Sequence, residues 1–186
     1  CVDRWLSGDG IPGTDATVYA ATTWDPDGPG PARELLFIAG DFEIAGDVFA
    51  NHVAVWNGAV WRPLGSGLNG HVHGLIVHGG ELIAGGTFTS AGGNPAPYIA
   101  KWNGRIWETL GGGFNGEVYC LAVYNGELIA AGSFTLADGN PIGHIARWDG
   151  ARWHPLVDGV SDPPSPYPRT YVGAMKVYDG ELIAAG

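Results

Sequence analysis

Two histidines, two residues apart, come closest in this sequence to a metal-binding motif. His71 and His73 stand in the run "HVH", so both side chains would lie on one face of a β-strand, and His78 is near. Two imidazoles can form part of a zinc or copper site. The same positions 46 residues later hold Glu117 and Tyr119, and no cluster of cysteines or carboxylates repeats beside them. We therefore interpret the pair as weak metal candidates on a solvated surface.

A second candidate is a calcium loop in the run "DPDGPG". Asp25 and Asp27 lie two residues apart in a glycine-rich loop, which is part of the pattern of a calcium-binding loop. The third ligand and the closing glutamate are missing. We favour a long hairpin turn here. Calcium is the one cofactor that the sequence leaves open, and no other is expected.

Catalytic motifs are missing from the sequence, and its composition excludes several classes of partner. There is no G-x-S-x-G, no H-E-x-x-H and no phosphate-binding loop. The 186 residues carry a net charge of −10, with lysine only at 101 and 176, which argues against binding to nucleic acid. No apolar run approaches the roughly 18 residues of a membrane span. We expect a non-enzymatic protein whose partners are neither nucleic acid nor a membrane core.

An internal repeat of 46 residues organises the chain. Identical aromatic residues recur at this step, and insertions fall between the repeated segments. Each copy contains short runs of strand length that are rich in β-branched and aromatic residues. No segment shows a sustained helical period, so the chain is predicted to be all-β. The recurring aromatic residues are Trp56, Trp102 and Trp148, then Trp61, Trp107 and Trp153, then Phe42, Phe88 and Phe134.

Dipeptides of the type Asn-Gly, Asp-Gly or Gly-Gly separate the predicted strands. They fit two-residue type I′ hairpin turns, because glycine and asparagine tolerate positive φ best. We therefore predict two-residue turns between first and second strands at 79–80, 125–126 and 179–180, and between third and fourth strands at 57–58, 103–104 and 149–150. The glycines of these six turns are Gly58, Gly80, Gly104, Gly126, Gly150 and Gly180.

Four antiparallel strands repeated every 46 residues are typical of β-propeller blades. In "AKWNGRIW" a two-residue turn would place Trp102 opposite Arg105 and make Trp107 its diagonal neighbour on the same face. We predict that these tryptophans, with their equivalents, are buried between neighbouring blades. A platform on which sugars stack is the alternative.

The strand count indicates an incomplete propeller. We expect an outer strand at 2–7, blades at about 17–66, 72–113 and 118–158, and a partial blade at 172–186 that supplies only a first and a second strand. Because the strand at 2–7 can serve as the fourth strand of this composite blade, only its third strand is missing. An unpaired strand edge invites pairing with another chain. We therefore expect further chain of the same protein, or a second polypeptide, against residues 172–186. A homo-oligomer is one such arrangement.

The two cysteines, Cys1 and Cys120, give little information about the compartment. Cys120 stands where Gly74 stands one repeat earlier, and we interpret it as a small buried residue of an inner strand. Cys1 belongs to a different, composite blade, so we expect no bond between the two. For Cys1 a free end, an intermolecular disulfide and lipidation all stay open.

The segment "ELIAGGTFTSAGGNPAPYIAKWNGRIWETLGGGFNG" resembles the kelch-like repeats of secreted bacterial propellers. These repeats are similar to the cortical-marker propeller repeats of fungi and, more distantly, to the propeller of galactose oxidase. The resemblance covers about four-fifths of the chain and implies a secreted or cell-surface location. The copper site of galactose oxidase needs a set of tyrosine, histidine and cysteine residues that cannot be placed here, so its activity is not implied.

Three functions stay open at this point. The first, which we favour, is a non-enzymatic extracellular propeller that serves structure, adhesion or protein interaction, as part of a larger surface assembly. The second is a glycan-binding propeller attached to a secreted enzyme, which exposed tryptophans would favour. The third is an enzyme with a site in the axial funnel, which clustered acidic residues or histidines on loops of one side would favour.

Overall fold

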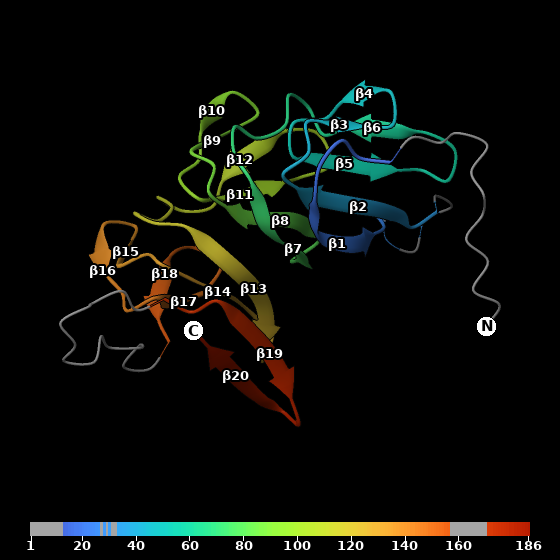
Figure 1. The fold of residues 1–186 in the computed structure, drawn as a ribbon. Helices are drawn as coiled ribbons and strands as arrows, with labels where there is room; N and C mark the ends of the chain where they lie inside the picture. The colour runs from blue at the N-terminus through green and yellow to red at the C-terminus, as the bar shows by residue number, and fades with distance from the viewer. Residues whose placement is uncertain (1–12, 27, 29, 31–32, 157–170) are drawn as a thin grey trace.

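The computed structural model describes residues 13–26, 28, 30, 33–156 and 171–186, and all of its regular elements are β-strands (Figure 1). The outer strand expected at 2–7, Cys1, Asp27 and the run "SDPPSPYPR" lie outside the described residues. The prediction of an all-β, partial β-propeller is confirmed. Its four-stranded antiparallel sheets follow one another in an arc.

Each of the three blades pairs its strands in chain order, from the inner to the outer edge. A two-stranded antiparallel sheet, here the C-terminal hairpin, follows the third blade. The first blade contains β1 (Val18–Trp24), β2 (Leu35–Gly40), β5 (Val53–Trp56) and β6 (Trp61–Pro63); the second β7 (Val72–His78), β8 (Glu81–Gly86), β11 (Ile99–Trp102) and β12 (Trp107–Thr109); the third β13 (Val118–Tyr124), β14 (Glu127–Gly132), β17 (Ile145–Trp148) and β18 (Trp153–Pro155); the hairpin β19 (Ala174–Tyr178) and β20 (Glu181–Ala185).

The blades pack face to face, and each uses opposite faces of its second strand for its two neighbours. Phe37 of the first blade joins one apolar cluster with Leu82 of the second. Ile83, which points to the other face of the second blade, joins the next cluster with Leu128 of the third. Ile129 then packs in a cluster that reaches the C-terminal hairpin. The innermost strands β1, β7, β13 and β19 contact one another in this order.

In the second blade, the third blade and the C-terminal hairpin, the turns between first and second strands are two-residue turns, as the dipeptides predict. In the first blade a longer loop joins Trp24 to Leu35. Tyr124 pairs with Glu127, which leaves only Asn125 and Gly126 in the loop. Their φ angles are 51° and 81°, so both central residues are left-handed, as a type I′ turn requires.

The turns between third and fourth strands differ from the prediction. Trp102 pairs directly with Trp107, so the loop has four residues and the two rings are cross-strand partners rather than diagonal neighbours. The side-chain Oδ1 of Asn103 accepts hydrogen bonds from the backbone N–H of Arg105 and Ile106, both at 3.0 Å. This bonding ties the side chain to the backbone that follows, and it favours the wider loop over a type I′ turn.

A small hairpin between the second and third strands of every blade was not predicted. Each has only two residues per strand, below the length at which hydrophobic alternation is readable. The repeated phenylalanines Phe42, Phe88 and Phe134 lie just before these hairpins and are at most 1% exposed. The hairpins are β3 (Ile44–Ala45) with β4 (Val48–Phe49), β9 (Ser90–Ala91) with β10 (Asn94–Pro95), and β15 (Leu136–Ala137) with β16 (Asn140–Pro141).

Candidate functional site

The described metal candidates, His71, His73 and Asp25, do not come together as a ligand set. His71 Nε2 lies 3.0 Å from Asp41 Oδ1, whereas His73 lies between the rings of Tyr19 and Tyr119. Asp25 directly follows β1. In the described part of the chain, no three histidine, cysteine or carboxylate side chains are close enough to hold a metal ion.

The repeated tryptophans are used between blades. Trp107 and Trp153 are each 3% exposed and Trp102 is 9% exposed, while Trp56, Trp61 and Trp148 are half-buried. The indole Nε1 of Trp107 donates a hydrogen bond of 2.8 Å to the carbonyl of Leu64, on the preceding blade. Trp153 repeats this bond one blade later, to Leu110 at 3.1 Å. These rings therefore fasten consecutive blades together.

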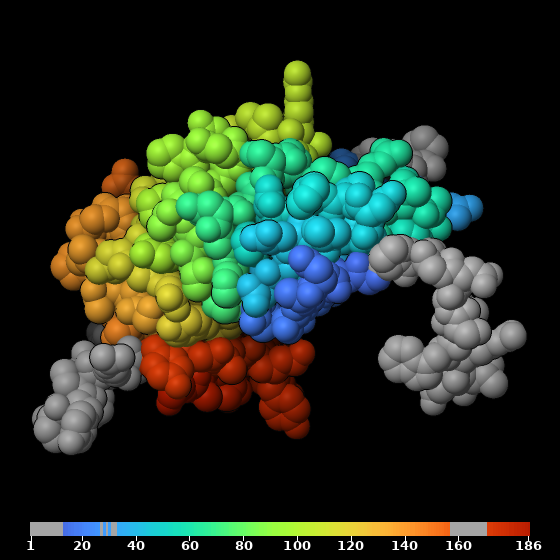
Figure 2. All heavy atoms as spheres, turned by 45° about the horizontal axis from the view of Figure 1, so that its top comes forward, coloured from blue at the N-terminus to red at the C-terminus, as the bar shows by residue number. Residues whose placement is uncertain are grey.

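The C-terminal hairpin presents an apolar face that is covered in the blades before it. Ile183 of β20 is 50% exposed, whereas the equivalent Ile83 and Ile129 are 2% and 0% exposed. The opposite face of β20 is turned to the third blade, where Leu182 packs against the cluster that contains Ile129. Figure 2 shows the hairpin at one end of the described body. The face that carries Ile183 is the strongest candidate for an interaction surface, and we call it the Ile183 face.

The outer backbone edge of β20 is also open among the described residues. In the second blade Ile83 of β8 pairs with Lys101 of β11, and in the third Ile129 of β14 pairs with Arg147 of β17. The described residues supply β20 with only β19 as a neighbour. Its outer N–H and C=O groups are therefore positioned to accept another strand.

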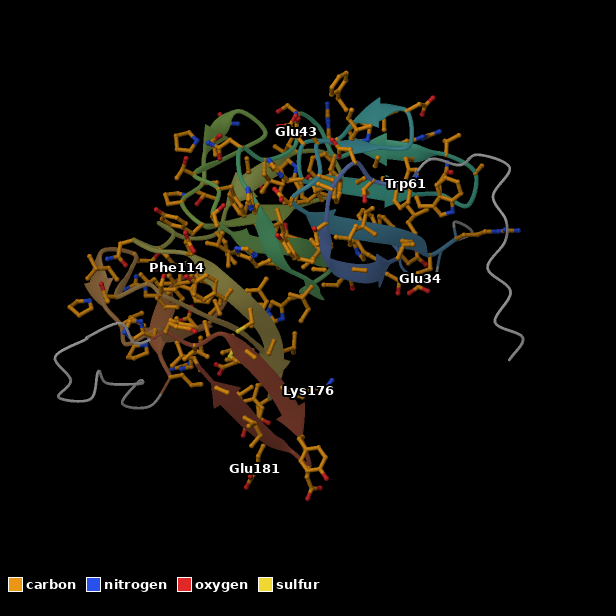
Figure 3. All side chains as sticks on the ribbon, in the orientation of Figure 1. Glu34, Glu43, Trp61, Phe114, Lys176 and Glu181 are labelled. Carbon is orange, nitrogen blue, oxygen red and sulfur yellow. The ribbon has the colours of Figure 1, made fainter. Side chains whose placement is uncertain are left out.

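An ion pair that is repeated in the second and third blades has one of its two positions beside this edge. Lys101 Nζ lies 3.0 Å from Glu81 Oε1, and Arg147 Nη1 lies 2.8 Å from Glu127 Oε1. The hydrogen bond to Glu81 raises the pKa of Lys101, so that the ammonium stays charged. Glu181 occupies the same position in the hairpin, where it is exposed (Figure 3). The salt bridges found between described residues do not include one to Glu181.

The other end of the arc exposes the complementary face of the repeat. Leu36 of β2 is 37% exposed, whereas the equivalent Leu82 and Leu128 are fully buried. Each blade has one face that carries the residue equivalent to Leu82 and an opposite face that carries the residue equivalent to Ile83. In the interior of the arc, the Leu82-type face of one blade packs against the Ile83-type face of the preceding blade. The two end faces are therefore apolar faces of the two types that meet in the interior seams.

Sequence reasoning identified the apolar hairpin but missed the role of its glutamate. The available signal was the pairing of Glu81 with Lys101, and of Glu127 with Arg147, at one spacing in two copies. It also missed the tyrosines that surround His73, because their side chains meet only when consecutive inner strands are aligned.

Comparison with known proteins supports the propeller reading over a short stretch. Residues 80–104, which run from the start of β8 to just past β11, match the model of a family described as a domain of unknown function (DUF5122) β-propeller. No curated protein matches the chain. In the described part of the chain, no helix is long and apolar enough to cross a membrane. The kelch-like resemblance stays a prediction.

Proposed function

We propose that this chain is a non-enzymatic protein-interaction module, which binds a further protein strand through the Ile183 face and the outer edge of β20. The observation that carries the proposal is the contrast between Ile183 at 50% exposure and its equivalents at 0–2%. Covering the exposed half of this side chain removes apolar surface from water and favours a complex by about 1 kcal/mol. The strand edge adds directional hydrogen bonds to this apolar contact.

The repeat itself specifies the chemistry of the strand that fits. In the second blade the strand beside β8 reads Ile-Ala-Lys-Trp, with Lys101 opposite Ile83 and Trp102 opposite Leu82. A partner strand in the same register places a cation opposite Ile183, within reach of Glu181. We infer that the partner supplies an apolar strand with one lysine or arginine followed by a tryptophan.

Two features support the interaction module over a glycan-binding propeller. Trp102, Trp107 and Trp153 are buried, and the latter two bond to the preceding blade, so these rings are not presented for stacking. We place the module outside the cell, in a surface assembly, because its repeats resemble those of secreted propellers. Fractionation of the native source with an antibody against the chain tests that location.

A synthetic peptide of residues 98–110, the sequence of β11 and β12, tests the proposed partner chemistry. We expect the labelled peptide to bind the 186-residue chain in fluorescence polarisation, and Ile183→Asp to abolish the binding. A peptide in which Glu replaces the lysine should bind about fivefold more weakly, because its carboxylate then lies diagonally across the strand pair from Glu181 and repels it.

Reversing the charge of Glu181 together with that of the peptide's lysine gives a matched control. The variant Glu181→Lys should prefer the glutamate peptide to the lysine peptide, while Ile106→Asp, an exposed change in a distant loop, should leave binding unchanged. The proposal is wrong if the lysine peptide does not bind the chain, or if Ile183→Asp binds it as well as the unaltered chain does.

A further inference from the structure

A β-bulge recurs at the start of the innermost strand of each blade. In the first blade Val18 pairs with Gly40 and Ala20 pairs with Ala39, so Tyr19 is an extra residue between two paired ones. The same shift makes His73 the extra residue of the second blade and Tyr119 that of the third. Bulges re-aim a side chain away from the pleated sheet, and here they bring one aromatic ring per blade into a common row.

The rings of this row contact one another from blade to blade. The centroids of Tyr19 and His73 are 5.4 Å apart, and those of His73 and Tyr119 are 5.8 Å apart. Tyr171, just before β19, continues the row at 5.7 Å from Tyr119 with its ring nearly perpendicular. Gly173 makes room for it, since a Cβ at that position would lie 3.1 Å from the Tyr171 ring.

These rings surround an open hollow of about 460 Å³, lined by Tyr19, His73, Tyr119, Tyr171 and Gly173. This size lies within the usual range of small-molecule sites. Tyr19 and Tyr171 are each 47% exposed, and His73 and Tyr119 are half-buried. The rings are inclined to one another by 50° to 82°, so they present faces and edges around a shared space rather than one flat platform.

The charge around the hollow is negative or neutral. Among the described residues that line it, there is no lysine or arginine. Burial lowers the pKa of His73, which keeps its ring neutral at pH 7, and the carboxylates of Glu117 and Asp41 are near enough to oppose that shift. Burial also raises the pKa of Tyr119, so its phenol stays protonated. A ligand that enters therefore meets aromatic rings, and the carboxylates of Glu117 and Asp41 are near enough to His73 to interact with it electrostatically.

We propose that this hollow binds a small organic cation with a quaternary or tertiary ammonium group. The face of an aromatic ring attracts a cation, and several inclined rings together can surround an alkylated ammonium head, which loses less hydration on leaving water than a primary ammonium does. The Glu117 and Asp41 carboxylates add long-range attraction for positive charge. The site is separate from the Ile183 face and uses different residues.

Choline and its neutral isostere 3,3-dimethyl-1-butanol form the matched pair of probes. We expect choline to bind the 186-residue chain in isothermal titration or in NMR titration, and the isostere to bind at least about tenfold more weakly, because only the charge differs. Methyl glucoside serves as a third probe, and we expect it not to bind. Equal binding of the two isosteres, or binding of the glucoside without choline, would overturn the proposal.

Two pairs of variants locate the binding. Tyr119→Leu should weaken choline binding about fivefold or more, while Tyr119→Phe, which keeps the ring, should retain it. Tyr19→Leu should have the same effect as Tyr119→Leu, whereas Tyr178→Leu, in the distant turn of the C-terminal hairpin, should have none. Circular dichroism confirms that each variant is folded. Choline affinity that is unchanged in both Tyr19→Leu and Tyr119→Leu would contradict the assignment.

Discussion

At the scale of single residues, the repeated tryptophans pack between blades, as their spacing in the sequence predicts. The 46-residue step identified Trp107 and Trp153 as packing residues, and both are 3% exposed. Their indole N–H groups add a bond that spacing alone does not reveal, to a carbonyl 43 residues earlier in the chain. A buried indole N–H usually finds such a partner. The result is a polar link between blades inside an apolar seam.

Removing one of these rings should destabilise the protein strongly. We expect Trp107→Ala to lower the free energy of unfolding by about 3–5 kcal/mol, from lost burial and an unfilled cavity. Trp107→Phe keeps most of the apolar contact and loses the bond to Leu64, so it should cost less. Chemical denaturation followed by circular dichroism measures both. Equal stability of Trp107→Ala and the unaltered protein would contradict the packing described here.

Cys120 offers a second test at this scale. It is partly buried on the inner strand β13, and burial raises the pKa of its thiol to about 11. Because only the thiolate reacts, its fraction at pH 8 should be about 100-fold below that of a free cysteine. We expect alkylation by iodoacetamide at pH 8 to be slower by about this factor in native protein than in denaturant. Equal rates would show that β13 is open in solution.

At the scale of elements, the two kinds of hairpin loop explain which predictions could succeed. In the type I′ turns the dipeptide is the whole loop, so the backbone preferences of its two residues determine the turn type. In the turns that follow the third strands, the dipeptide is the same, but Asn57, Asn103 and Asp149 use a side-chain oxygen to hold the backbone N–H groups two and three residues ahead. Composition alone does not separate these two uses of Asn-Gly.

A pair of glycine substitutions separates them. Asn125→Gly should change stability little, because φ at this position is +51° and glycine adopts it freely. Asn103→Gly removes the acceptor of two hydrogen bonds and should cost about 1–2 kcal/mol. Thermal or chemical unfolding of the two variants measures this difference in stability. If both turns were type I′, the two substitutions would have equally small effects.

The small hairpins mark the limit of sequence reasoning at this scale. Their strands are two residues long, and what holds them is non-local: Asn69 Oδ1 accepts the N–H groups of Thr89 and Ser90, 20 and 21 residues later. Asn115 repeats this arrangement one copy on. Contacts over such separations depend on the finished blade, so a local reading of strand propensity does not anticipate them. The aromatic row around His73 was missed for the same reason.

At the scale of the whole molecule, the repeat predicts the arc of blades and the structure shows its two unmatched ends. Every interior seam joins an Ile83-type face to a Leu82-type face of the next blade. The described arc ends in one face of each type, at Ile183 and Leu36. A head-to-tail contact between such faces is heterologous, and it closes into a ring or extends according to its rotation. This match is the physical argument for the protein partner that we propose.

Hydrogen exchange on β20 tests this claim most directly. In the free chain, we predict that the outward amides of β20 exchange much faster than the equivalent amides of β14, which are bonded to β17. Saturating peptide of residues 98–110 should slow the β20 amides and leave those of β14 unchanged. If β20 is already as protected as β14 in a monodisperse monomer without peptide, the Ile183 face is not an open interaction surface and the proposed function is wrong.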